Sequence, residues 1–216
     1  MENKKAAVYE KIKSRIIEGK LTPGLPINEN GFAQDFNVSK TPVREALRHL
    51  EREGLVENVP GRGSAVTHIT FQDIREVFEI REIIECGAAK RAALICDAEE
   101  VREKKRELEQ FSAQEAESKG DIWGPEEDIH LFLIKCVGNK RFLEIYLGLL
   151  DHMKRIRHHF GRQFTRQRFD EMLTEHRAIL DALIEGDGDR AEQAVQNHLH
   201  NAAAYLLGLT SQKKGG

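Results

Sequence analysis

Proline is the feature of this sequence that most limits its fold, because it interrupts helices and central strands. Four of the five prolines, Pro23, Pro26, Pro42 and Pro60, precede residue 61, and only Pro125 lies beyond them. This distribution predicts a compact N-terminal unit with frequent turns, followed by long helices. With 6% aromatic and 32% charged residues, the composition also favours a mostly helical chain over a β-sandwich.

Charge and hydropathy exclude several classes of protein. The formal net charge of −3 excludes a uniformly basic coat for nucleic acid, so any binding face must be local. The sequence has no apolar run long enough to span a membrane, and its N-terminus is charged where a signal peptide is apolar. We therefore expect a soluble cytoplasmic protein with no membrane partner. The three cysteines, Cys86, Cys96 and Cys136, form no C-x-x-C motif and are expected to be reduced core residues.

The pattern of residues 1–69 predicts a winged helix-turn-helix. Apolar residues at helical spacing predict helices over residues 8–17, 29–36 and 40–53. Ser39 can cap the third of these helices, and Pro42 fits in its first turn. Two short apolar runs, 55–59 and 64–69, flank a glycine-containing turn and predict a hairpin. In this architecture the third helix enters the DNA major groove.

The exposed side of the third helix carries the chemistry of DNA recognition. Arg44 can make a bidentate contact to guanine, and hydroxyls beside the helix N-terminus can hold phosphates. Glycine in the hairpin turn lets the backbone approach the duplex closely. A solvated basic face is the alternative for such a helix alone, but the order of elements favours DNA binding. The predicted DNA contacts are Ser39, Lys40, Thr41, Arg44, Arg48, Gly61 and Arg62.

These residues resemble a known family. The stretches VSKTPVREAL at 38–47, LEREGLV at 50–56 and GRG at 61–63 are similar to the DNA-binding domain of GntR-type bacterial transcription regulators. The resemblance covers roughly residues 7–69 and implies operator contacts by Ser39, Lys40, Thr41, Arg44 and Gly61. The family usually has arginine at the positions of Lys40 and Asn30, so one guanidinium fork becomes a point charge and operator preference should differ.

Residues 70–216 are predicted to form a second, all-helical domain. Helical periodicity recurs, with short links, in six segments that suggest an antiparallel bundle of about six helices. The predicted segments are roughly 71–93, 101–116, 125–138, 142–160, 169–184 and 190–207, with Asp97 as the cap of the second.

Seven of the nine histidines follow residue 70, and three of them indicate a metal site. Glu126 and His130 lie four residues apart on one predicted helix face, and His176 and His198 lie on apolar faces of the last two helices. A single histidine of this kind is more often structural than a ligand. If the three converge, their imidazoles and a carboxylate suit a divalent transition metal, Zn²⁺ or Ni²⁺, with Mn²⁺ or Fe²⁺ as alternatives.

A second resemblance concerns this domain. Glu126-x-x-x-His130, Gly138-Asn139, Glu175-His176 and His198-Leu199 are similar to the effector-binding FCD domain of the FadR subfamily, over roughly residues 72–208. The resemblance implies a metal bound by one aspartate and three histidines, with a small organic acid on or beside it. The matching positions are Glu126, His130, His176 and His198. Glutamate replaces the usual aspartate, and Glu127 or a water can substitute for it.

Donors for an acid are predicted on two helices. Arg81 matches the inward arginine of the family's R-x-x-x-E pattern, and His152 or Arg155 on the fourth helix can face the same cavity. The alternative for Arg81 is an ion pair with Glu85, one turn further on.

The sequence as a whole predicts a homodimeric transcription regulator, not an enzyme. Helix-turn-helix proteins read two half-sites, so two-fold symmetry supplies the pair of DNA-binding units. A small carboxylate bound at the metal is expected to control operator binding. The alternatives are a sensor of the metal ion itself and a metal-dependent hydrolase, for which no positioned base is evident.

Overall fold

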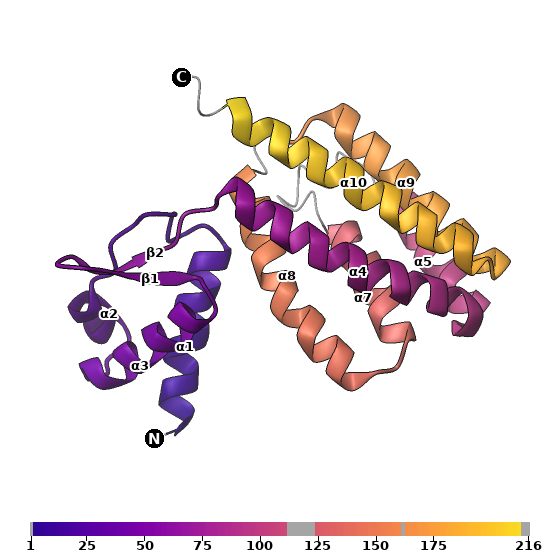
Figure 1. Ribbon diagram of the computed structural model, residues 1–216. Helices are drawn as coiled ribbons and strands as arrows, with labels where there is room; N and C mark the ends of the chain where they lie inside the picture. Colours follow the sequence, from indigo (N-terminus) through magenta and orange to yellow (C-terminus); the bar gives the residue numbers. More distant parts are fainter. Residues whose placement is uncertain (1, 112–123, 161–162, 213–216) are drawn as a thin grey trace. The chain divides into compact units, whose positions relative to one another are not determined.

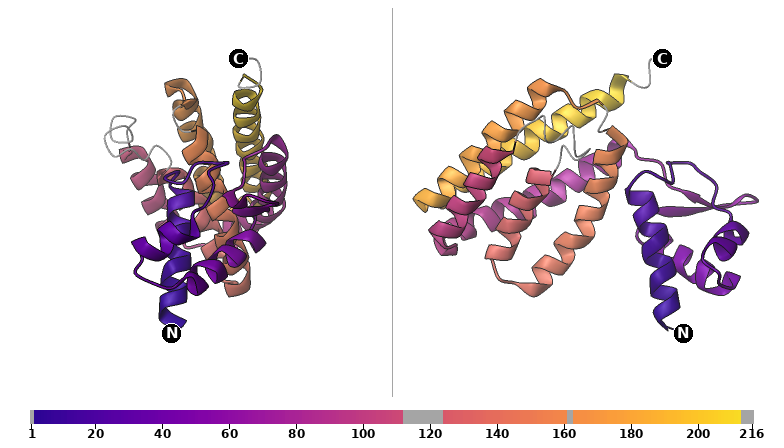
Figure 2. Two further views of the ribbon diagram at one scale, coloured as in Figure 1. Left: turned by 90° about the vertical axis from the view of Figure 1, so that its left-hand side faces the viewer. Right: turned by 180° about the vertical axis from the view of Figure 1, so that it is seen from behind.

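The computed structural model describes residues 2–111, 124–160 and 163–212, with side chains over 5–111, 129–160 and 163–208. The chain packs as two compact units (Figures 1 and 2). The first comprises residues 1–70 and 154–159, and the second comprises 71–153 and 160–216. None of the described helices is long and apolar enough to cross a membrane.

The first unit has the predicted order of three helices and a hairpin. Its elements are α1 (Glu2–Ile17), α2 (Glu29–Asp35), α3 (Lys40–Arg52), β1 (Val56–Val59) and β2 (Gly63–Val66) (Figure 1). Helix α1 packs against α3, and the core between the elements includes Ile12, Val43 and Leu50, all fully buried. The turn before α3 passes through Asn37 at φ 51°, a left-handed conformation that asparagine tolerates. The winged helix-turn-helix prediction is confirmed.

The hairpin is antiparallel, with Val56 opposite Val66 and Val59 opposite Gly63. The segment after α1, which the sequence predicted only as a turn, also pairs with β2. The amide of Gly24 donates to the carbonyl of Val66 at 2.8 Å, and the amide of Ile27 donates to that of Ser64 at 2.8 Å. This pairing covers part of an edge that a two-stranded hairpin would otherwise expose.

The second unit is the predicted helical bundle. Its described helices are α4 (Phe71–Ile95), α5 (Ala98–Gln110), α7 (Gly124–Cys136), α8 (Lys140–Phe160, apart from residues 154–159), α9 (Arg166–Glu185) and α10 (Gly188–Gln212). Helix α10 packs along α4 and α9, α5 packs along α9, and α7 packs against α4 (Figure 2). Asp97 caps α5 as predicted, since its carboxylate accepts from the amide of Glu99 at 2.7 Å.

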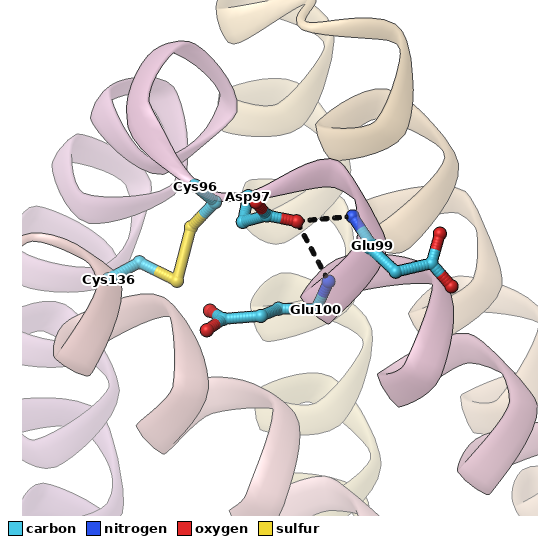
Figure 3. The surroundings of a disulfide bond; sticks show 5 residues. All are labelled: Cys96, Asp97, Glu99, Glu100 and Cys136. Carbon is cyan, nitrogen blue, oxygen red and sulfur yellow. Dashed lines mark hydrogen bonds between the residues drawn. A yellow bond between two sulfur atoms is a disulfide. The ribbon is translucent and has the colours of Figure 1, made fainter.

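One prediction about the cysteines is wrong. Cys96 and Cys136, 40 residues apart, are joined as a disulfide with their Cα atoms 5.6 Å apart (Figure 3). The packing of α7 against α4 brings the C-terminal ends of the two helices together, which the spacing of the cysteines does not reveal. Cys86 is a buried free thiol, as expected.

Candidate functional site

The predicted DNA contacts all lie on exposed surface of the first unit. Five belong to α3 or the residue before it, and two belong to the β1–β2 turn. They are Ser39, Lys40, Thr41, Arg44, Arg48, Gly61 and Arg62. The buried residues of α3 lie on its other face: Val43, Ala46, Leu47 and Leu50. Helix α3 therefore presents a basic and hydroxyl-bearing surface to solvent.

Two of these residues make informative local contacts. The Nε of Arg44 donates to Oε2 of Glu29 at 2.8 Å, in an ion pair whose arginine side chain is 60% exposed. An exposed pair is weak, so the guanidinium can exchange this partner for DNA. Ser39 occupies the N-cap position of α3, but its side chain, which the structure describes, makes no capping hydrogen bond. The predicted N-cap position of Ser39 is confirmed, but the first amides of α3 receive no hydrogen bond from its hydroxyl.

The three predicted histidines meet in the core of the second unit. His130 lies on α7, His176 on α9 and His198 on α10, and a ring nitrogen from each lies within 4.8 Å of the others. All three side chains are at most 1% exposed. The structure thus brings together residues that are far apart in sequence.

A carboxylate orients the ring of His130. Its Nδ1 lies 2.5 Å from Oε2 of Glu85 on α4. The other oxygen of Glu85 accepts from the Nε of Arg81 at 2.6 Å and from the hydroxyl of Tyr146 at 2.8 Å. Because Glu85 is fully buried and held by these donors, it fixes the rotation of the imidazole.

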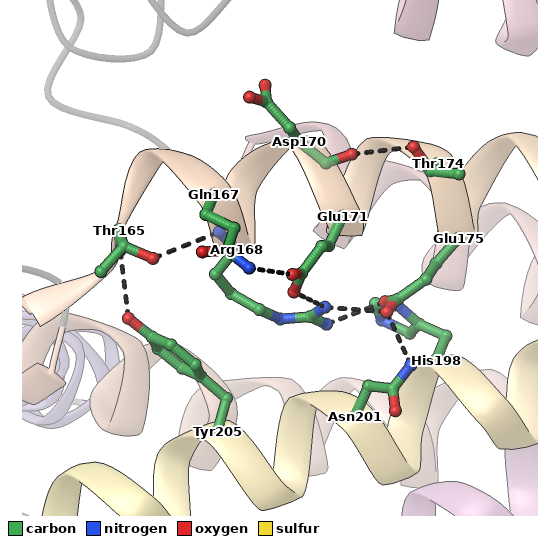
Figure 4. A network of polar contacts seen from close by, with 10 residues as sticks. All are labelled: Thr165, Gln167, Arg168, Asp170, Glu171, Thr174, Glu175, His198, Asn201 and Tyr205. Atoms are coloured by element: carbon green, nitrogen blue, oxygen red, sulfur yellow. Dashed lines mark hydrogen bonds and ion pairs between the residues drawn. The ribbon is translucent and has the colours of Figure 1, made fainter.

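A second carboxylate orients His198 (Figure 4). The Nδ1 of His198 lies 2.7 Å from Oε2 of Glu175 on α9. Arg168 binds Glu175 through both of its terminal nitrogens, each at 2.8 Å, and Asn201 donates to the same carboxylate at 2.8 Å. Arg168 and Glu175 lie seven residues apart, two turns along one helix face.

The two oriented rings face one another. The Nε2 atoms of His130 and His198 lie 3.2 Å apart. A carboxylate only accepts, so a neutral ring that donates to it through Nδ1 has its lone pair on Nε2. Two such lone pairs repel unless they share a cation. Nitrogen ligands of a tetrahedral zinc site, with bonds of about 2.0–2.1 Å, lie about 3.3 Å from one another, so this donor set fits a divalent metal.

The protonation states agree with that chemistry. Burial lowers the pKa of His130 to about 4, against the influence of Glu85, so the ring is neutral near pH 7. Burial tends to raise the pKa of Glu175, but hydrogen bonds from His198 and Arg168 outweigh it and lower this pKa to about 2. Burial of Glu85 is similarly outweighed, chiefly by Arg81, and its pKa lies below the ordinary range. Neutral imidazoles backed by ionised carboxylates are the states that metal ligation requires.

The other predicted site residues have different outcomes. The side chain of Glu126 lies outside the described residues. Arg81 is 1% exposed and paired with Glu85, which was the alternative interpretation. Arg155 is buried and donates to the carbonyl of Thr67, and His152 is half-buried on α8. An effector-binding role for Arg81, His152 and Arg155 stays a prediction.

Sequence reasoning gave no role to the carboxylate of Glu175 or to the guanidinium of Arg168. The seven-residue spacing of these two residues, next to His176, is a signal that could have found them. Tyr146 offers no comparable signal, because it reaches Glu85 from a helix 61 residues further along the chain.

Comparisons with known proteins agree with this architecture. Residues 4–66 match the family of bacterial regulatory proteins called gntR, and residues 76–201 match the FCD domain. The chain is 30% identical to the HTH-type transcriptional repressor RspR of Escherichia coli K12, over 89% of this chain and 84% of RspR.

Solved structures show the same fold. A transcriptional regulator GntR from Rhodococcus sp. RHA1 has a TM-score of 0.76 and 26% identity, covering 95% of this chain and 98% of that one. The Zn²⁺-bound FCD domain of TM0439 has a TM-score of 0.54 and 24% identity, covering 65% of this chain and 95% of that one. Because both matched domains and the relatives are those of regulators and not of enzymes, this chain is a DNA-binding transcription regulator that belongs to the GntR family and carries an FCD domain.

Proposed function

We propose that this regulator binds operator DNA as a homodimer, and that a small carboxylate bound at a divalent metal controls this binding. The metal would be held by His130, His176 and His198, with Glu126 as the expected fourth ligand. The single observation that carries the proposal is the pair of Nε2 atoms facing each other at 3.2 Å, each fixed by a carboxylate behind its ring.

A bound divalent ion would supply a concentrated positive charge with coordination positions open to a carboxylate oxygen. This chain's residues supply the rest: three histidine rings, two carboxylates that orient two of these rings, and a buried setting that strengthens electrostatic interactions. TM0439, a protein with the same FCD fold, has been solved in Zn²⁺-bound and metal-free forms. Zn²⁺ or Ni²⁺ suits the donors best, with Mn²⁺ or Fe²⁺ as alternatives.

The DNA-binding part of the proposal assigns base contacts to Arg44 and backbone contacts to its neighbours. Exposed side chains at the start of α3 and at the hairpin turn suit phosphates. The residues with this proposed role are Ser39, Lys40, Thr41, Arg48, Gly61 and Arg62. Since the target is operator DNA, the proposal locates the protein in the bacterial cytoplasm.

A second candidate function is a sensor of the metal ion itself. It is favoured by the state of Arg81, whose guanidinium is committed to Glu85 at 2.6 Å instead of being presented to an organic anion. In this case the ion alone would shift the DNA-binding equilibrium.

One binding experiment tests these proposals. Operator fragments are selected from random DNA with the full-length protein, and affinity is measured by fluorescence anisotropy with metal-loaded, chelated and reloaded samples. A panel of small carboxylic and sugar acids is then added to each. We expect a class of acid to change affinity only when metal is present, and a fragment with two half-sites to bind far more tightly than one half-site.

Three other results of this experiment would each contradict one part of the proposal. If chelation and reloading alone switch affinity and no acid adds to the effect, the metal-sensor function is correct. If neither metal nor acid changes affinity, the control mechanism is wrong. Equal affinity for one and two half-sites would contradict the homodimer.

A further inference from the structure

We propose that Cys96 and Cys136 form an oxidation site, a dithiol that reacts reversibly with hydroperoxides or low-molecular-weight disulfides. When oxidised to the disulfide, the pair would restrain the helices that carry part of the histidine cluster and slow the release of a bound metal. The formation of the disulfide is argued from the positions of the two cysteines and does not depend on the metal site. The effect on metal release rests on the proposed metal site.

The backbone holds the two cysteines at bonding distance. Cys96 directly follows α4, and Cys136 is the last residue of α7, with Cα atoms 5.6 Å apart. Disulfides span Cα separations of about 4.4–6.8 Å. The amide of Cys96 donates to the carbonyl of Ala92 at 2.8 Å, and the next residue, Asp97, caps α5 (Figure 3). The position of Cys96 is therefore fixed by helices on both sides of it.

The two cysteines differ from the third in accessibility. Cys96 and Cys136 are both half-buried, so small oxidants and reductants can reach them. Cys86 is 8% exposed, and burial raises its pKa to about 12, which leaves it a protonated and unreactive thiol. The chain thus contains its own internal control.

The reaction balances with either oxidant. A thiolate attacks the terminal oxygen of a hydroperoxide and the O–O bond breaks: that oxygen stays on sulfur as a sulfenic acid, and the alkoxide leaves and takes a proton to become an alcohol. The second thiol then attacks the sulfenic sulfur, forming the disulfide and releasing water. With glutathione disulfide, the first thiolate releases one glutathione and the second thiolate releases the other. In a cytoplasm that keeps thiols reduced, such a pair is usually transient and redox-sensing.

The disulfide would connect helix α7, which carries His130, to the end of helix α4, which carries the carboxylate next to that ring. Helix α4 carries Glu85 and α7 carries His130, whose Nδ1 lies 2.5 Å from Glu85. Cys136 lies within two turns of His130 on the same helix. Because the crosslink restrains α7 against α4, oxidation should suppress the local opening that lets a bound metal escape.

The test compares three full-length proteins: wild type, Cys96→Ser and Cys86→Ala. Each is treated with glutathione disulfide or with dithiothreitol, the reagent is removed, and the number of free thiols per chain is measured in the denatured protein. For wild type and Cys86→Ala we expect oxidation to remove two thiols with the loss of two hydrogen atoms in mass. Their melting temperature should rise by roughly 5 °C or more. Cys96→Ser should form no intramolecular disulfide and show no rise.

Metal release is then followed with zinc-loaded samples and a colorimetric chelator. Oxidation should slow release by about three-fold or more in wild type and Cys86→Ala, and should leave Cys96→Ser unchanged. Failure of wild type to form the disulfide would overturn the oxidation site. Disulfide formation with unchanged release would overturn the clamp. If wild type binds no zinc in either state, the metal site fails, while the thiol count and melting temperatures still decide the oxidation site.

Discussion

Glu85 and Glu175 occupy equivalent places behind two rings of the histidine cluster. Each has an oxygen close to an Nδ1 atom, at 2.5 Å for His130 and 2.7 Å for His198, and each is held by an arginine of its own helix. Such carboxylates fix the tautomer and the orientation of a ligating ring. The donor properties of the histidines therefore depend on residues that would not touch the metal.

Removing a proposed ligand should remove most of the metal. For His176→Ala and His198→Ala we expect the zinc content of the purified protein to fall well below that of wild type, because each change removes one of the nitrogen atoms proposed to coordinate the metal. The control is His200→Ala, which changes an exposed histidine of the same helix as His198 that pairs with Glu82. Elemental analysis by mass spectrometry gives the metal content. Equal zinc content in all four proteins would refute the site.

Removing an orienting carboxylate should weaken the site without abolishing it. We expect Glu175→Gln to lower zinc affinity by about 10–100-fold, because a neutral amide accepts more weakly than a carboxylate and so holds and polarises the ring of His198 less strongly. Glu171→Gln is the matched control, since Glu171 accepts from the same arginine, Arg168, at 3.4 Å (Figure 4). Competition with a chelator of known affinity measures both. An equal loss in the two variants would mean that the effect comes from Arg168 and not from the ring.

At this scale the sequence predicted which histidines could lie together, but not the residues that orient them. The three histidines follow from residue type, helix face and resemblance. Their orienting contacts depend on which helices pack together, as when Tyr146 on α8 reaches Glu85 on α4. Periodicity describes one helix at a time, so these contacts could not be derived from it.

Among the elements, the pairing of the segment after α1 with β2 depends on a glycine. Gly24 has a φ of 79°, and a Cβ atom there would lie 2.6 Å from the ring of His68. Gly54, after α3, has a similar φ of 71°, but an added Cβ would meet no described atom within 4 Å. A side chain at Gly54 would therefore add backbone strain alone, whereas one at Gly24 would add backbone strain and a steric clash.

This difference predicts unequal destabilisation. We expect Gly54→Ala to lower the free energy of unfolding by about 1–2 kcal/mol, the cost of a left-handed residue with a side chain. Gly24→Ala should cost more, because His68 must also move. Chemical denaturation of the two variants and wild type measures this. Equal losses would show that His68 moves aside without cost.

Helix α3 gives a second prediction at this scale. Arg44→Ala should abolish sequence-specific binding, and Arg44→Lys should lose most of it, because lysine keeps the charge but not the bidentate fork. Arg102→Ala removes an exposed arginine of α5 that pairs with Glu99, and serves as the control for net charge. Gel shift with a selected operator and a scrambled duplex makes the comparison. Specific binding by Arg44→Ala would contradict the recognition-helix assignment.

The helices and strands could be predicted from the sequence, but the contacts between segments distant in sequence could not. Helical spacing placed every described helix, and the Asp97 cap was confirmed. The added pairing of Gly24 and Ile27 with β2, and the meeting of Cys96 with Cys136, were missed. Both are contacts between separate segments, and a single sequence carries no pattern that identifies them.

At the scale of the whole molecule, the proposed function requires that a buried site in one unit control DNA binding by the other. A ligand shifts such an equilibrium only by its difference in affinity for the two states, typically about 1–3 kcal/mol in allosteric proteins. This amounts to roughly a 5–150-fold change in operator affinity, enough to alter occupancy. Under the proposed function, a carboxylate effector would have to bind the metal-loaded histidine site more tightly in one state than in the other.

The most direct test of this central claim is a thermal-shift screen of the full-length protein against small carboxylic and sugar acids, before and after chelation. A ligand that binds only the native state raises the melting temperature by mass action. We predict that one class of acid stabilises the metal-loaded protein, and that chelation or His198→Ala abolishes the shift. If no acid shifts melting while chelation alone destabilises the protein, the claim that a carboxylate binds at this metal is contradicted.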